Sequence, residues 1–292
     1  MNPFLYNLIY KYFSYIRYRV LTKNLGLKQC YADIGGHKVC YFVSPNEGQP
    51  LVLIHGLLDS AFGFRKIVPF LEKKYKLYII DIPGFGKSKL PPIQYLYQVD
   101  IFSDMIYKVF QKLSLGNIVL CGHSMGGLIA QHITIKDAEL KRVQKLVLLS
   151  SGGIPHPERD KMRAVLFPAD HEEVGRLLQH LYYKETPMPS KLIRKTLVHA
   201  WNSREYKFLA ENTIERETEI FFGSEARKIK IPTTIISGKQ DLITTPEAMK
   251  TLKSYIRGSK LILLEHTRHA IHLEKPKEVA EIINGLQKKI DS

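Results

Sequence analysis

The sequence predicts an α/β protein, with a mostly parallel, twisted sheet, helices on both of its faces and an inserted helical cap. Short apolar runs of strand length alternate with helix-length segments, which is typical of parallel strands joined by crossover helices. From Gly152 to about Lys230 this alternation stops, and helical stretches separated by prolines replace it. We therefore expect a core of residues 28–151 and 231–292, a cap of residues 152–230 and an N-terminal segment of residues 1–27.

The expected elements follow one another along the core. A hairpin comes first, with strands Gln29–Ile34 and His37–Val43 joined by the turn Gly35-Gly36. The other strands are apolar runs at Leu51–Ile54, Leu77–Asp81, Ile118–Cys121, Leu146–Leu149, Thr234–Ser237 and Leu261–Leu264. Helices are expected at Phe62–Leu71, at Val99–Leu113, from Met125, from Pro246 and at Pro276–Gln287.

The expected hairpin also indicates whether two of the cysteines can form a disulfide. With a two-residue turn, Cys30 faces Tyr41 and Tyr31 faces Cys40, so the two thiols point to opposite faces of the sheet. We expect no disulfide between Cys30 and Cys40. Three cysteines make no disulfide framework, which favours a reducing compartment and hence a cytoplasmic protein.

The N-terminal segment is rich in aromatic residues. Lys11 and Arg17 interrupt it, and no small-residue cleavage site follows, so it resembles neither a spanning helix nor a secretory signal. On a helix, one face would carry Phe4, Leu5, Leu8, Ile9, Tyr12, Phe13, Ile16 and Val20, and the other Asn7, Lys11, Ser14 and Arg17. Two alternatives stay open: residues 1–20 lie peripherally on a membrane surface, at its inner face, or this helix packs on its own domain.

The chain is strongly basic, with 43 Lys and Arg against 28 Asp and Glu and a formal net charge of +15. Such a surface attracts anions, including anionic lipid and nucleic acid. No zinc-finger spacing, RNA-binding signature or arginine-rich run accompanies the charge. We therefore expect no nucleic-acid partner, and either a lysine-rich surface or attraction to a membrane explains the excess.

One motif carries chemistry. Gly122-His123-Ser124-Met125-Gly126 matches G-x-S-x-G and stands between an apolar strand and a helix, where a nucleophile elbow belongs. Small residues flank the serine because strand and helix approach each other closely there. Ser124 is therefore the expected nucleophile.

A nucleophilic serine needs a base and an acid, and in this arrangement they follow it in the order acid, then histidine. Asp241 ends a strand in Ser237-Gly-Lys-Gln-Asp241, which makes it the expected acid. His269-Ala-Ile-His-Leu-Glu-Lys-Pro276 resembles the histidine loop of the α/β-hydrolase family, and this resemblance implies His269 as the base. Arg268 stands where the family usually has glycine, which leaves His266 as the alternative.

The same resemblance covers nearly the whole chain, from about Gln29 to Gln287. Ile54-His55-Gly56-Leu57 is similar to the family's His-Gly loop and implies an oxyanion hole made by the backbone N–H groups of Leu57 and Met125. His55 is expected to be a structural hydrogen-bonding residue. The loop Asp81-Ile-Pro-Gly-Phe-Gly-Lys-Ser88 is expected to serve the architecture rather than the chemistry.

The resemblance also limits the class of reaction that we expect. Family members that cleave haloalkanes or epoxides carry aspartate at the elbow, and those that cleave carbon–carbon bonds commonly have tryptophan soon after the catalytic histidine, where this chain has Ala270 and Ile271. Ester hydrolysis is therefore expected. The stretches Glu172–Tyr183 and Lys230–Asp241 resemble membrane-associated monoacylglycerol-lipase-type hydrolases, which implies a small-molecule ester with an acyl chain.

Other functions stay open at this point: a small-ester esterase, a carbon–carbon or amide hydrolase of the same fold, and a non-catalytic ligand-binding protein. No metal-ligand cluster and no phosphate-cradling loop stands in the right context, so we expect neither metal nor cofactor. The residues that bind the substrate are not indicated by the sequence.

Overall fold

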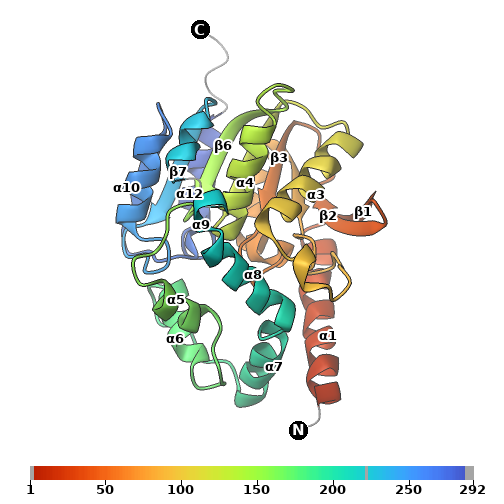
Figure 1. Ribbon diagram of the computed structural model, residues 1–292. Coiled ribbons are helices and arrows are strands. Elements are labelled where there is room, and N and C mark those ends of the chain that lie inside the picture. Colours follow the sequence, from red (N-terminus) through yellow and green to blue (C-terminus); the bar gives the residue numbers. More distant parts are fainter. Residues whose placement is uncertain (1–2, 221–222, 287–292) are drawn as a thin grey trace.

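The computed structural model describes residues 3–220 and 223–286, and it contains an eight-stranded sheet of order β1-β2-β4-β3-β5-β6-β7-β8 (Figure 1). β2 pairs antiparallel with β1 and with β4, and all other pairs are parallel. The predicted fold class is confirmed. The strands are β1 (Lys28–Ile34), β2 (His37–Val43), β3 (Gln49–Ile54), β4 (Tyr75–Ile80), β5 (Ile118–His123), β6 (Val143–Leu149), β7 (Thr233–Gly238) and β8 (Lys260–Leu264).

The sheet separates two apolar cores because neighbouring residues of a strand point to opposite faces. In β3, Val52 and Ile54 join one core, and Leu51 and Leu53 join the other. The first core lies under α3 (Val99–Lys112), α4 (Met125–Lys136) and α10 (Pro246–Tyr255). The second lies under α2 (Val68–Leu71) and α12 (Pro276–Gly285). Between β8 and α12 stands the short α11 (Ile271–Glu274).

The hairpin has the predicted register, with Cys30 opposite Tyr41 and Tyr31 opposite Cys40, and all three cysteines are free. The helix expected at Phe62–Leu71 is wrong: a 3-10 turn (Ala61–Lys66) precedes α2. Pro69 has no N–H to continue an α-helical ladder through this segment, which explains the break. The expected end of the last helix at Gln287 falls outside the described residues.

Between β6 and β7 the chain forms helices that Figure 1 shows grouped below the sheet. We call residues 152–230 the helical insertion; Phe221 and Phe222, expected in its apolar part, lie outside the described residues. Serines cap two of its helices, with Ser190 accepting from the Ile193 N–H and Ser203 from the Tyr206 N–H. The helices are α5 (Arg159–Leu166), α6 (Val174–Leu181), α7 (Lys191–Trp201), α8 (Arg204–Glu215) and α9 (Glu217–Ile220).

The N-terminal helix α1 (Pro3–Arg19) packs against α7 and the core, but with a face other than the apolar one expected. Tyr18 is buried, and Arg17, expected on the polar face, lines an internal cavity. The outer face carries Phe4, Leu8 and Tyr12, which are 72%, 55% and 62% exposed. Among the described residues, no helix is both long and apolar enough to cross a bilayer.

A buried carboxylate joins α1 to the core. Asp81, directly after β4, accepts hydrogen bonds from the Tyr18 hydroxyl (2.9 Å), the Ala61 N–H (2.7 Å) and the Lys87 N–H (2.8 Å). Burial raises the pKa of Asp81 to about 6, against the lowering effect of these three donors. Gly86 is required here because a Cβ would lie 2.4 Å from the Asp81 carboxyl and its φ is +57°.

Tyr18→Phe should destabilise the protein by about 1.5–3 kcal/mol, the range for a hydrogen bond to a charged group. The folded-state pKa of Asp81 is raised, so the stability that its proton contributes is lost as pH rises through about 6. Removing the Tyr18 donor raises this pKa further. The loss in free energy of unfolding caused by Tyr18→Phe should therefore be larger at pH 8 than at pH 5. Urea unfolding at both pH values measures it, with the exposed Tyr15→Phe on the same helix as control. Equal losses in the two variants would contradict the anchoring role.

Candidate active site

Ser124 stands on a strained turn between β5 and α4. Its φ of +54° and ψ of −121° are values that residues other than glycine rarely adopt. A Cβ at Gly122 would lie 2.1 Å from the Gly126 carbonyl oxygen, and one at Gly126 would lie 2.3 Å from the His55 carbonyl oxygen. The flanking glycines are therefore required by close backbone contacts, and the turn presents Ser124 at the carboxyl end of the sheet.

The acid and the base expected from the sequence are in contact. Asp241 follows β7 and His269 follows β8, and because these strands are parallel neighbours their ends lie at one edge of the sheet. His269 Nδ1 lies 3.0 Å from Asp241 Oδ2 and 3.3 Å from Oδ1, and both side chains are buried. With the Nδ1–H donated to Asp241, the Nε2 lone pair of His269 is available as a base.

Thr244 completes the surroundings of Asp241, and the sequence analysis missed it. Its hydroxyl donates to Asp241 Oδ2 (2.9 Å) and lies 3.4 Å from His269 Nδ1. The N–H groups of Ile243 and Thr244 donate to Asp241 Oδ1 at 2.8 and 3.0 Å. The turn spacing Asp-x-x-Thr after a strand was the available signal. These donors hold the carboxylate in one orientation toward His269.

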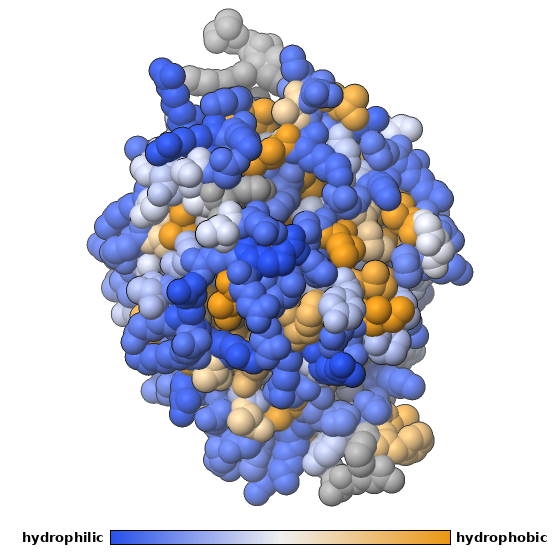
Figure 2. Space-filling view, viewed as in Figure 1, coloured by the Kyte–Doolittle hydropathy of each residue, from blue (hydrophilic) through white to orange (hydrophobic). Residues whose placement is uncertain are grey.

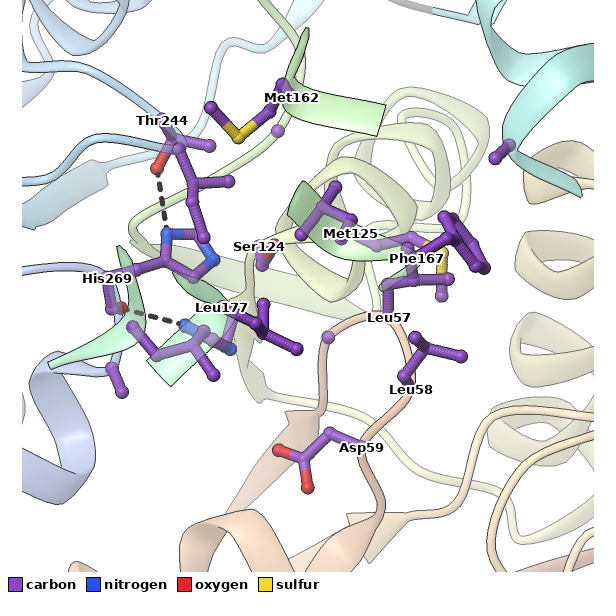
Figure 3. Close-up of a pocket in the computed structure, with 18 of the residues that line it drawn as sticks. Leu57, Leu58, Asp59, Ser124, Met125, Met162, Phe167, Leu177, Thr244 and His269 are labelled. Atoms are coloured by element: carbon purple, nitrogen blue, oxygen red, sulfur yellow. Dashed lines mark hydrogen bonds between the residues drawn. The ribbon is translucent and has the colours of Figure 1, made fainter. Parts of the chain in front are cut away.

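Ser124 and His269 line the same cavity, and Figure 3 shows the two side chains next to each other. No hydrogen bond joins the Ser124 hydroxyl to His269 Nε2 in the described part of the chain. Contacts of this kind are often long without substrate and shorten when substrate binds. The alternative base, His266, is exposed and contacts the Tyr183 hydroxyl at 3.3 Å. The geometry thus favours His269.

Three further histidines surround the site. The His123 and His272 rings pack edge to face with their centres 4.4 Å apart, and the His123 Nε2 lies 3.0 Å from the His269 carbonyl oxygen. Burial lowers the pKa of His272 to about 3 and holds that of His123 well below its ordinary value. His55 accepts from the Ile82 N–H and contacts the Gly56 carbonyl, and burial lowers its pKa to about 4. Burial thus favours the neutral form of all three rings, which limits their repulsion of a positive charge on His269.

The two backbone groups expected at the oxyanion hole flank Ser124. A Cβ at Gly56 would lie 3.1 Å from the Ser124 Cβ, which shows how closely the loop before Leu57 approaches the nucleophile. Met125 is the first residue of α4, where N–H groups have no partner within the helix. Within residues 3–220 and 223–286, neither the Leu57 nor the Met125 N–H has a backbone acceptor outside regular elements. In this part of the chain, the two N–H groups are therefore positioned to donate to a ligand oxygen.

The cavity above Ser124 has a volume of about 500 Å³. Most of its wall is apolar and comes from the core and from the helical insertion (Figure 3). Representative lining residues are Leu57, Met125, Met162, Phe167, Leu177 and Trp201. The described residues contain no group of three His, Cys, Asp or Glu side chains that could hold a metal ion.

The family model described as "alpha/beta hydrolase fold" matches residues 49–276, which is most of the chain. The chain belongs to the α/β-hydrolase family. This α/β-hydrolase is 29% identical to the uncharacterized hydrolase YugF of Bacillus subtilis, over 86% of this chain and 94% of that one. It is 24% identical to the 2-hydroxy-6-oxo-6-(2'-aminophenyl)hexa-2,4-dienoic acid hydrolase of Metapseudomonas resinovorans, over 86% of this chain and 87% of that one. It is 23% identical to the monoacylglycerol lipase abhd6-B of Xenopus laevis, over 95% of this chain and 87% of that one.

Among solved structures, a membrane phospholipase A superposes on this α/β-hydrolase with a TM-score of 0.79. The two chains are 22% identical, and the match covers 92% of this chain and 90% of the other. At this identity the likeness concerns the fold alone. The relatives agree on hydrolysis and differ in substrate, so the substrate has to be argued from the cavity.

Thr244→Val should lower kcat by about tenfold, because it removes one donor from Asp241 and leaves side-chain volume almost unchanged. KM should change little, since Thr244 acts through Asp241 and His269. Steady-state kinetics on a chromogenic ester measure both constants. Thr251→Val, in the exposed part of α10, is the matched control. A kcat equal to that of the control would show that Thr244 does not position the acid.

Proposed function

We propose that the protein is a serine hydrolase that cleaves carboxylic esters through an acyl-enzyme intermediate, with lipid esters such as acylglycerols as its substrates. The contact between Asp241 and His269, beside Ser124 in an apolar cavity, is the observation that carries this proposal. A serine hydroxyl is a weak nucleophile unless a neighbouring base removes its proton, and this arrangement supplies that base.

The reaction proceeds in two halves. The Ser124 hydroxyl attacks the ester carbonyl while His269 Nε2 takes its proton, and Asp241 stabilises the resulting imidazolium. The Leu57 and Met125 N–H groups bind the developing oxyanion. His269 then gives its proton to the leaving alcohol, and the acyl group stays on Ser124. Water attacks this acyl-enzyme with the same base, which releases the acid and restores the serine.

The apolar wall of the cavity is evidence that the cavity binds the acyl chain of the substrate. Side chains such as Phe167, Leu177 and Trp201 line it, and each buried CH₂ group stabilises binding by about 0.8 kcal/mol. The resemblance to a monoacylglycerol lipase is consistent with this class. We propose that the helical insertion acts as the cap that shields the acyl chain from water.

We also propose that α1 rests on a lipid surface that carries anionic headgroups. Its outer face carries exposed Phe4, Leu8 and Tyr12 next to Lys11 and Arg19. Figure 2 shows hydrophobic side chains at the lower right edge of the molecule, where α1 begins in Figure 1. Aromatic and aliphatic side chains beside basic ones are typical of helices that lie in the plane of a membrane. The net charge of +15 adds attraction to anionic lipid.

The esterase proposal predicts a rate that depends on acyl-chain length. Across p-nitrophenyl esters and monoacylglycerols, kcat/KM should peak at medium or long chains. Ser124→Ala should lose about 10⁴-fold or more, because the residual rate then comes only from binding and the oxyanion hole. A peak at acetyl or butyryl would make the protein a small-ester esterase. Rates equal to those of Ser124→Ala on every ester would contradict ester hydrolysis.

The membrane proposal predicts binding to vesicles that contain phosphatidylserine, measured by co-sedimentation. Replacing Phe4, Leu8 and Tyr12 together by serine should weaken binding by more than tenfold, since each apolar side chain loses its burial in lipid. A matched control replaces Tyr31, Ile93 and Leu140, which are exposed elsewhere, by serine. Unchanged binding in the α1 variant would indicate attraction by charge alone and contradict docking through α1. Equal weakening in both triple variants would contradict it as well, because the effect would then not be specific to α1.

A further inference from the structure

One end of the cavity is polar, and the mechanism above makes no use of it. Arg17 from α1, Asp59 and Arg65 from the segment after β3, and Tyr182 from the helical insertion all line the same cavity as Ser124. Three separate parts of the chain therefore bring ionisable side chains to this end, beside a wall that is otherwise mostly apolar.

The carboxylate of Asp59 can accept hydrogen bonds from a ligand. It lies two residues after Leu57, on the loop that passes beside the nucleophile, and Figure 3 shows its carboxylate on the side of Ser124 opposite Met162. A Cβ at residue 63 would lie 2.1 Å from Asp59 Oδ2, so Gly63 leaves space for this carboxylate. Burial raises the pKa of Asp59 to about 6, while the Ser60 N–H and the two arginines lower it.

The donors around Asp59 are held in place by an aromatic ring. The Arg65 guanidinium lies 4.3 Å from the Phe62 ring centre and donates to the Phe62 carbonyl at 3.2 Å, and the Arg17 guanidinium lies 5.8 Å from the same centre. In the described part of the chain, neither arginine forms an ion pair with Asp59. Both guanidinium groups thus lie close enough to the carboxylate to lower its pKa, while their N–H donors are not used in a direct ion pair with it.

We propose that Arg17, Asp59, Arg65 and Tyr182 form a subsite for the hydroxyl groups of a polyol, such as the glycerol half of a monoacylglycerol. This inference rests on the proposed function. A hydroxyl both donates and accepts, so it matches a place where a carboxylate and guanidinium groups lie together. A hydrocarbon leaving group would leave these groups unpaired.

The subsite gives α1 a role in recognition. Tyr18, anchored to Asp81, fixes the end of the helix that carries Arg17, so the N-terminal helix forms part of the wall of the cavity. The acyl chain then occupies the apolar part near Phe167 and Trp201, and the polyol lies at the end formed by Arg17 and Asp59.

The test compares a 1-monoacylglycerol with the methyl ester of the same fatty acid. The ratio of their kcat/KM values should favour the glycerol ester and fall about tenfold in Asp59→Asn and in Arg17→Gln. Lys23→Gln, at an exposed basic residue shortly after the same helix, should keep the wild-type ratio. Thermal unfolding checks that each variant is folded. Wild-type ratios in both Asp59→Asn and Arg17→Gln, with ester hydrolysis still dependent on Ser124, would overturn the subsite and leave the proposed function intact.

A binding measurement separates the two proposals further. Ser124→Ala should bind the intact monoacylglycerol about tenfold more tightly than the methyl ester, and adding Asp59→Asn should abolish this difference. The measurement needs no turnover. If no ester is hydrolysed, the proposed function fails while the binding preference still decides the subsite. Equal affinity for the two esters in Ser124→Ala would overturn the subsite.

Discussion

The hydrogen bond between His269 Nδ1 and Asp241 is the interaction on which the proposed chemistry depends. It exists because β7 and β8 are parallel neighbours, so that the loops after them start from the same edge of the sheet. Thr244 and two backbone N–H groups hold the carboxylate, and the His123 ring packs against the rings of both His269 and His272. The contacts of His269 with Asp241 and His123 hold its imidazole beside Ser124 (Figure 3).

A second buried carboxylate connects the N-terminal helix to this site. Asp81 binds Tyr18, Ala61 and Lys87 together, and it thereby fixes both α1 and the start of the segment that carries Phe62 and Arg65. The polar end of the cavity is built from these same two segments. α1 therefore links the exposed apolar face that we assign to lipid with the proposed polyol subsite, and a substrate could be recognised where it leaves the lipid surface.

Sequence reasoning was most successful where the signal was local. The apolar strands, the hairpin register and the helix from Val99 follow from periodicity and turn residues, and the fold class is confirmed. The helix expected from Phe62 was wrong because Pro69 interrupts it. Thr244, Asp59 and Arg17 were not predicted as site residues, since their importance comes from contacts between segments that are distant in sequence. The choice between His266 and His269 also needed the structure, because both stand on one loop after β8.

The central claim is that Ser124 is activated by His269. The most direct measurement is the rate at which a fluorophosphonate probe labels the protein, with the modified residue identified by mass spectrometry. We predict rapid labelling at Ser124 and a loss of about 10³-fold or more in His269→Gln, which removes the base. Labelling of another residue, or an unchanged rate in His269→Gln, would contradict the account.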